Sequence, residues 1–91
     1  MSSSKLVLID FYADWCSTCQ TMEPTIDAIQ EKFGVQLEIL KINTEENPQM
    51  AALYHIRSVP TYILFKNGEI VWKVAGLLTK KEFIQTIEKQ L

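Results

Sequence analysis

Two cysteines separated by two residues, Cys16 and Cys19, are the side chains best suited to chemistry in this 91-residue chain, and they are its only cysteines. An apolar run precedes them and an amphipathic segment follows, so Cys16 is predicted at the start of a helix. The free N–H groups and the dipole of a helix N-terminus favour a thiolate there, and the thiolate is the form that attacks disulfides. Cys19 lies one turn later on the same side, where it can attack a mixed disulfide at Cys16. The pair therefore predicts thiol–disulfide exchange.

The same spacing also supplies half of a zinc site, which needs four ligands, or three and a water molecule. The remaining ligands would be carboxylates and His55, the single histidine. His55 is distant in sequence and precedes Val59-Pro60, where a lone histidine is usually a surface or capping residue. A C-x-x-C pair between a strand and a helix is a redox signature, so we expect no metal site.

The segments around the cysteines predict a strand followed by a helix. Residues 5–13 are rich in aliphatic and aromatic side chains without alternation, as is typical of a strand covered on both faces. The helix is predicted to end at Phe33, because Gly34 favours a left-handed stop. Pro24 should bend it by removing one backbone hydrogen bond. Its apolar residues recur at helical spacing and are assigned to the core: Met22, Ile26 and Ile29.

A second strand and helix complete a crossover unit. Residues 36–43 read as a strand, and Asn47 is predicted to cap a short helix that begins at Pro48 and runs to about Tyr54. Such strand–helix–strand crossovers are right-handed, so the first two strands should be parallel.

The last third of the chain predicts a hairpin and a final helix. Residues 61–66 and 69–75 flank Asn67-Gly68, a strong signal for a tight antiparallel turn. Trp72, on the second of these strands, is assigned to packing rather than to function. Thr79 and Glu82 have the spacing of a capping box. The inner face of the helix that follows is predicted to comprise Phe83, Ile84, Ile87 and Leu91.

The element order β-α-β-α-β-β-α predicts an α/β protein with a mixed four-stranded sheet and helices on both faces. Ninety-one residues suit a single domain over 1–91 and are too few for two ordinary cores. The formal net charge of -2 leaves no basic excess for nucleic acid. The longest apolar runs, such as Leu6 to Ile9, have about four residues, against about 20 for a membrane helix.

The N-terminus does not read as a signal peptide, because Met1–Lys5 has one positive charge and Asp10 interrupts the apolar stretch that follows. We therefore expect a cytoplasmic protein. Residues 1–4 are expected to be disordered or a cloning remnant. A remnant of that kind that replaced an export segment would instead make the protein periplasmic.

Motifs well beyond the cysteines resemble the thioredoxin family. The lead-in Asp10-Phe11-Tyr12-Ala13-Asp14-Trp15-Cys16 is similar to the strand that enters the family's active site. Further similarities, which extend the resemblance from about Lys5 to Leu91, are Pro24, Lys41, Val59-Pro60-Thr61, Phe65-Lys66-Asn67-Gly68-Glu69 and Gly76.

The resemblance implies a thioredoxin fold without the family's usual first strand and helix. It also implies a monomeric disulfide reductase that acts on disulfide-containing proteins. A thioredoxin-reductase-like protein or another thiol donor would recharge it. The Cys16–Cys19 couple would serve without any cofactor.

The family's buried carboxylate corresponds to Asp10. In an apolar strand an unpaired charge is costly, so its pKa should be raised or the group should find a partner. The resemblance then makes Asp10 the general base for Cys19, with Lys41 as its charge partner. The alternative is that Asp10 points to solvent at a strand end.

The family's substrate surface corresponds to residues near Pro60. The Val59–Pro60 bond is expected to be cis, with the loop against the cysteines and the Val59 backbone available to an extended substrate peptide. The plainer reading is that Pro60 begins a strand, where proline is tolerated. The shallow apolar platform would consist of Trp15, Val59, Pro60 and Gly76.

One departure concerns the residues between the cysteines. Ser17-Thr18 stands where thioredoxins usually have Gly-Pro, and this pair tunes the balance of thiolate and disulfide. Other readings stay open at this point. They are the thioredoxin-like domain of a transmembrane thiol:disulfide interchange protein, which shares Tyr-Ala-Asp-Trp-Cys and acts outside the cytoplasm, a binding module with idle cysteines, and a metal or iron–sulfur protein.

Overall fold

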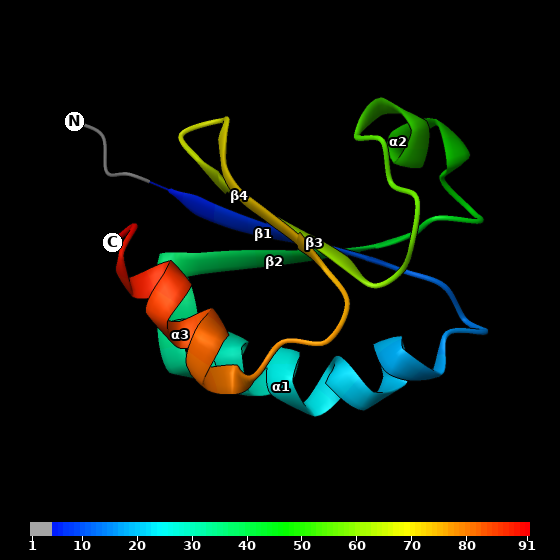
Figure 1. The fold of residues 1–91 in the computed structure, drawn as a ribbon. Coiled ribbons are helices and arrows are strands. Elements are labelled where there is room, and N and C mark those ends of the chain that lie inside the picture. The colour runs from blue at the N-terminus through cyan, green and yellow to red at the C-terminus, as the bar shows by residue number, and fades with distance from the viewer. Residues whose placement is uncertain (1–4) are drawn as a thin grey trace.

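The computed structural model describes residues 5–91, and the expectation for residues 1–4 lies outside this range. The sheet has the strand order β2-β1-β3-β4 (Figure 1). A short 3-10 turn at Gly34–Gln36 separates the first helix from the second strand. The elements are β1 (Leu6–Tyr12), α1 (Ser17–Phe33), β2 (Leu37–Asn43), α2 (Pro48–Leu53), β3 (Thr61–Lys66), β4 (Glu69–Ala75) and α3 (Lys80–Glu88).

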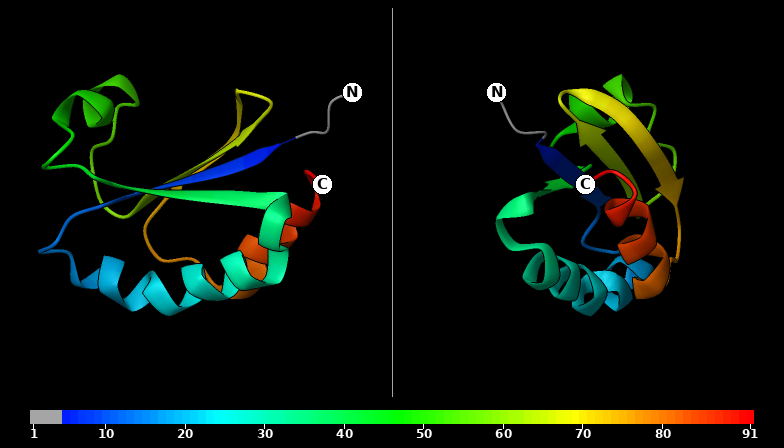
Figure 2. Two further views of the ribbon diagram at one scale, coloured as in Figure 1. Left: turned by 180° about the vertical axis from the view of Figure 1, so that it is seen from behind. Right: turned by 90° about the vertical axis from the view of Figure 1, so that its left-hand side faces the viewer.

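Strand β1 is paired on both of its edges, parallel to β2 and antiparallel to β3. This confirms the predicted parallel crossover and the mixed sheet. Asp10 lies opposite Lys41 on one side and opposite Tyr62 on the other. Helices α1 and α3 cover one face of the sheet, and the short α2 lies on the other face, near the end of β1 from which the chain enters α1 (Figures 1 and 2).

The main core lies between the sheet and helices α1 and α3. Phe83 of α3 is fully buried and makes edge-to-face contacts with Tyr62 at 5.0 Å and with Trp72 at 5.9 Å between ring centroids. Trp72 therefore packs as predicted. The helical stripe predicted for the core is also buried: Met22, Ile26, Ile29 and Phe33. A smaller cluster under α2 joins Met50 and Tyr54 to the opposite face of the sheet.

Two expectations about element ends are wrong, and a third holds only in part. Strand β2 begins at Leu37 and not at residue 36, because Gln36 belongs to the 3-10 turn. Asn47 is the N-cap residue of α2, which begins at Pro48 as predicted, but its side chain makes no capping hydrogen bond; its amide donates to the carbonyl oxygen of Asn43 at 3.0 Å. Leu91 is 55% exposed because α3 ends at Glu88, so it does not join the inner face.

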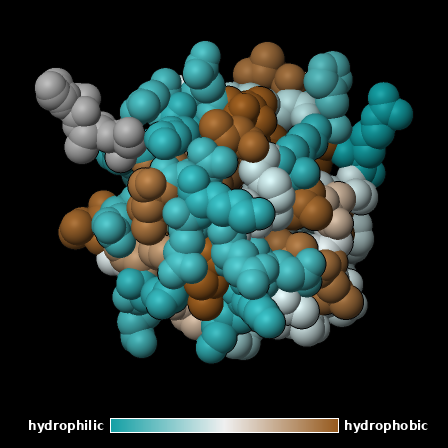
Figure 3. All heavy atoms as spheres, turned by 60° about the vertical axis from the view of Figure 1, so that its left-hand side comes forward, coloured by the Kyte–Doolittle hydropathy of each residue, from teal (hydrophilic) through white to brown (hydrophobic). Residues whose placement is uncertain are grey.

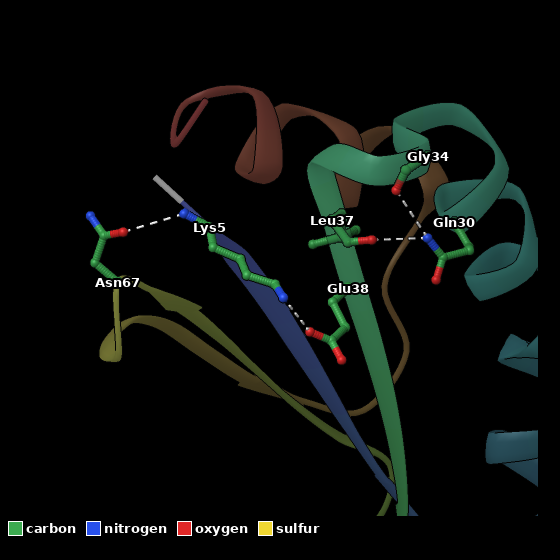
Figure 4. A network of polar contacts seen from close by, with 6 residues as sticks. All are labelled: Lys5, Gln30, Gly34, Leu37, Glu38 and Asn67. Carbon is green, nitrogen blue, oxygen red and sulfur yellow. Dashed lines mark hydrogen bonds and ion pairs between the residues drawn. The ribbon is translucent and has the colours of Figure 1, made fainter. Parts of the chain in front are cut away.

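Side-chain contacts fasten the end of the sheet opposite the cysteines (Figure 4). The Gln30 amide donates to the carbonyl oxygens of Gly34 and Leu37, at 3.3 and 2.9 Å, and so joins the end of α1 to the start of β2. The Lys5 ammonium pairs with Glu38 at 3.0 Å, while the Lys5 backbone N–H donates to Asn67 Oδ1 at 3.3 Å. These contacts hold β1 between its two neighbours.

The β3–β4 hairpin turns at Asn67 and Gly68, both with positive φ, as a type I′ turn requires. The register shifts between Leu64 and Phe65, and Val71 is the extra residue on β4. On the face of the molecule in Figure 3, apolar residues form separate patches among hydrophilic ones. None of the helices within residues 5–91 is long and apolar enough to cross a membrane.

We expect Phe83→Ala to lower the free energy of unfolding by about 3–5 kcal/mol, because it removes the ring that fills the core between α3 and the sheet. Urea denaturation followed by circular dichroism measures this. Val35→Ala, at a fully exposed position, is the control and should stay within about 0.5 kcal/mol of the parent. Equal losses in the two variants would contradict the packing described.

Candidate active site

Cys16 is the N-cap residue of α1, at the point where the chain leaves β1. Its backbone is extended, and its N–H donates to the carbonyl oxygen of Ala13 at 3.1 Å, across the turn at Asp14 and Trp15 that follows β1. The Cys16 Sγ accepts a hydrogen bond from the backbone N–H of Cys19 at 3.0 Å. The two cysteines form a disulfide, with Cα atoms 5.3 Å apart. The sequence-based expectation of a bonded pair at a helix start is therefore confirmed.

The loop before β3 lies against this pair. The Val59–Pro60 bond is cis, as expected, and the carbonyl oxygen of Val59 is 3.6 Å from Cys16 Sγ. When the pair is reduced, the Cys16 thiol can donate to this oxygen. Gly76 is also fixed here, because its N–H donates to the Pro60 carbonyl oxygen at 2.9 Å. Its φ of 95° is one that residues with a side chain rarely adopt.

Trp15 projects from the surface beside the cysteines and is 70% exposed. Its indole N–H donates to Glu45 Oε2 at 3.1 Å, which orients the ring. A shallow groove of about 140 Å³ runs between Trp15 and the loop before β3. Its walls are formed by Trp15, Thr44, Ile56, Arg57, Ser58 and Val59.

The two residues between the cysteines form the first turn of α1. Ser17 is exposed, and its carbonyl oxygen accepts a hydrogen bond from Thr21 Oγ1 at 3.1 Å. Thr18 is partly buried. Neither side chain belongs to the buried core.

Asp10 is buried in the middle of the sheet, with 7% of its surface exposed. The interpretation in which it points to solvent is wrong. Its Oδ1 atom is inaccessible and has no hydrogen-bond partner among residues 5–91. Burial disfavours the charged form and raises the pKa of Asp10 from 3.8 to about 6; the Lys41 charge opposes this rise and the Glu23 charge adds to it.

A cavity of about 240 Å³ joins Asp10 to the cysteine pair. Its walls are formed by Asp10, Tyr12, Cys19, Glu23 and Lys41. Lys41, the charge partner expected from the resemblance, reaches this cavity because the parallel register sets it opposite Asp10. It acts across the cavity, since no contact ion pair joins it to Asp10 in the described part of the chain.

Sequence reasoning missed Tyr12 and Glu23 as members of this site. Glu23 had a readable signal, because it follows Cys19 by four residues and so lies on the same face of the helix. Tyr12 follows Asp10 by two residues on β1, which places both on the same face of the strand.

The alternative reading combined the two cysteines with His55 and carboxylates in a metal site. Between Lys5 and Leu91, no group of three or more histidine, cysteine, aspartate or glutamate side chains is arranged to hold a metal ion. His55 is exposed just after α2, with its N–H bonded to the Ala52 carbonyl oxygen at 3.1 Å.

Comparison with known proteins gives consistent results. The family model described as thioredoxin matches residues 1–89. The chain is 42% identical over its whole length to "Thioredoxin 1" of Nostoc sp., of which it covers 85%. It is 43% identical over its whole length to "Thioredoxin Y1, chloroplastic" of Arabidopsis thaliana, of which it covers 53%. Among solved structures, a mutant thioredoxin from Halobacterium salinarum superposes with a TM-score of 0.87 at 40% identity, covering 94% of this chain and 74% of that one.

These matches do not favour the reading as a domain of a transmembrane interchange protein. Relatives of the chain include cyanobacterial and chloroplast thioredoxins. Thioredoxins act on protein disulfides with their own cysteine pair, and thioredoxin reductase or ferredoxin–thioredoxin reductase reduces them. The chain belongs to the thioredoxin family and is a thiol–disulfide oxidoreductase that reduces protein disulfides.

Proposed function

We propose that Cys16 is the nucleophile and Cys19 the resolving residue of this reductase. The Cys16 thiolate attacks a substrate disulfide, forms a mixed disulfide and releases one substrate thiolate. The Cys19 thiolate then attacks Cys16 Sγ, so that the Cys16–Cys19 bond forms and the second substrate sulfur leaves with the electron pair. Each released sulfur takes up a proton. Two electrons thus pass from the dithiol to the substrate.

The observation that carries this assignment is the hydrogen bond from the Cys19 N–H to Cys16 Sγ at 3.0 Å. A donor aimed at the sulfur from the first turn of a helix stabilises the thiolate over the thiol. Ser17 and Thr18, in that same turn, are proposed to tune the stability of this thiolate relative to the disulfide.

Asp10 is proposed to take the proton from Cys19 during the second step. The two side chains line one cavity, and a carboxyl with a pKa of about 6 is a stronger base than an ordinary aspartate. Lys41, across the same cavity, is the proposed charge partner, because its positive charge favours the ionised form of Asp10.

The proposed substrate surface consists of Trp15, Val59, Pro60 and Gly76. The Val59 carbonyl oxygen lies beside Cys16 Sγ, so an extended peptide that pairs with the Val59 backbone brings its disulfide to the nucleophile. The shallow groove beside Trp15 is consistent with substrates of varied shape.

We further propose that the protein works as a cytoplasmic monomer without a bound metal and is not a partner of nucleic acid. Its electrons would come from a thioredoxin-reductase-like protein or another thiol donor, as its family membership suggests. The chain's net charge of -2 supports the exclusion of nucleic acid.

Cys19→Ser should trap the mixed disulfide, because the attack that releases the substrate is removed. With insulin as the disulfide substrate, non-reducing electrophoresis should show a covalent adduct, and dithiothreitol should reduce its mixed disulfide and separate the two proteins. Cys16→Ser should form no adduct and lack reductase activity. Adduct formation by the Cys16→Ser variant in place of Cys19→Ser would reverse the two assignments.

The order of reactivity is tested separately by alkylation of the reduced protein. At mildly acidic pH, iodoacetamide should label Cys16 before Cys19, since Cys16 retains more thiolate. Peptide mass spectrometry identifies the labelled residue. Preferential labelling of Cys19 contradicts the proposal.

Asp10→Asn should raise stability and slow exchange. A carboxyl whose pKa is 3.8 unfolded and about 6 folded contributes its full stability below pH 3.8 and loses it as the pH rises through 6. The variant should therefore gain about 3 kcal/mol over the parent at pH 8, and this gain should be absent at pH 3.5. Urea denaturation at the two pH values measures it.

The matched control is Asp14→Asn, at an exposed position. Its difference from the parent should stay within about 0.5 kcal/mol at both pH values. The exchange rate of Asp10→Asn near pH 7 should fall, and an unchanged rate would remove Asp10 from the proton transfer.

A further inference from the structure

Glu23 reaches the same cavity as the redox pair from the solvent side. It lies on α1 one helical turn after Cys19, and its side chain is exposed, whereas Asp10 at the other wall is buried. The cavity's volume of about 240 Å³ has room for several water molecules. A carboxylate, a buried carboxyl and a thiol therefore share one small polar space.

We propose that Glu23 is a positioning residue of the exchange reaction: from the solvent side of the shared cavity, its carboxylate acts through Asp10 and raises the pH above which Asp10 accepts the Cys19 proton. The inference rests on the role of Asp10 proposed above. It adds a second acidic group to the machinery, on a different element from the first.

The physical basis is the repulsion between two negative charges across the cavity, which acts on Asp10 because that carboxyl is buried. When Asp10 ionises, a second negative charge appears near that of Glu23, so the protonated form of Asp10 is favoured. Lys41 acts in the opposite sense from β2. Tyr62, opposite Asp10 on β3, stays neutral because burial and the Asp10 charge both raise its pKa. The groups that face Asp10 are thus Tyr12 on β1, Lys41 on β2, Tyr62 on β3, and Cys19 and Glu23 on α1.

The consequence for the reaction concerns the resolving step. Asp10 as carboxylate takes the proton of the Cys19 thiol, and the Cys19 thiolate forms the bond to Cys16 while the substrate thiolate leaves. The proton on Asp10 then returns to solvent through the cavity. A stronger base at Asp10 gains more from this transfer, so Glu23 increases the rate at neutral pH while it raises the pH at which the reaction begins.

The first experiment measures Asp10 directly. The chain has three aspartates, Asp10, Asp14 and Asp27, so labelling their side-chain carboxyl carbons with ¹³C gives few signals, and Asp10→Asn identifies the buried one. In the reduced protein, Glu23→Gln should lower the Asp10 titration midpoint by about half a pH unit. Lys41→Gln should raise it.

The matched control is Glu31→Gln, a second exposed glutamate on the same helix. It lies eight residues, or about 12 Å along the axis, from Glu23. The Asp10 midpoint should be unchanged in this variant. Equal shifts in Glu23→Gln and Glu31→Gln, or no shift in Glu23→Gln, would overturn the inference.

The second experiment links the midpoint to turnover. The rate of insulin reduction, followed against pH, should have an acid limb that moves down by the same half unit in Glu23→Gln, with a rate near pH 8 about twofold lower. In the Asp10→Asn background, Glu23→Gln should have no further effect. An additive loss there would mean that Glu23 does not act through Asp10.

The two proposals fail in different ways. If Asp10→Asn exchanges as fast as the parent, the proposed role of Asp10 fails, and this inference fails with it. If Asp10→Asn is slow but Glu23→Gln matches the parent in midpoint and pH profile, only the role of Glu23 fails.

Discussion

Strand β1 is hydrogen-bonded on both edges and covered on both faces, and this double enclosure determines where the reactive groups lie. A strand held by two neighbours cannot shift its register without exposing its apolar side chains. Its far end therefore delivers the chain to the start of α1 at a fixed place, where Cys16 caps the helix. Its middle fixes Asp10 opposite Lys41, and its antiparallel neighbour begins at the loop that contacts Cys16.

The buried Asp10 is expected to weaken the fold at neutral pH, because its charged form is disfavoured inside the sheet. Asp10 has neighbours that change its proton affinity without neutralising it through a direct ion pair in the described chain. An apolar residue at this position would strengthen the core. Buried groups that lower stability and have a shifted pKa are typical of active sites. Asp10 and Cys19 line the same cavity, so the destabilising carboxyl lies close to the redox-active sulfur atoms.

Much of the fold was predictable because its signals are local and periodic. The buried pattern of residues 5–13, the Asn67-Gly68 turn and the Thr79 capping box each specify one element. That Lys41 is the charge partner of Asp10 was expected from the resemblance alone, and the register that sets the two residues opposite each other came from the structure. The spacing of Glu23 from Cys19 was a readable signal for the helix face, but the sequence alone does not tell that this face meets Asp10 across a cavity. The capping bond expected of the Asn47 side chain is absent because its amide binds the Asn43 carbonyl instead, and Leu91 was misplaced because α3 ends at Glu88.

The register shift near Val71 has a consequence for how the molecule meets other chains. Strand β4 is an outer strand with Ile70 and Val71 exposed, a combination that invites a neighbouring chain to add itself to the sheet. The extra residue bends the strand and breaks the regular spacing of its free backbone groups. A strand edge interrupted in this way is a poorer template for a further strand, so protein substrates that meet it are less able to extend the sheet and aggregate.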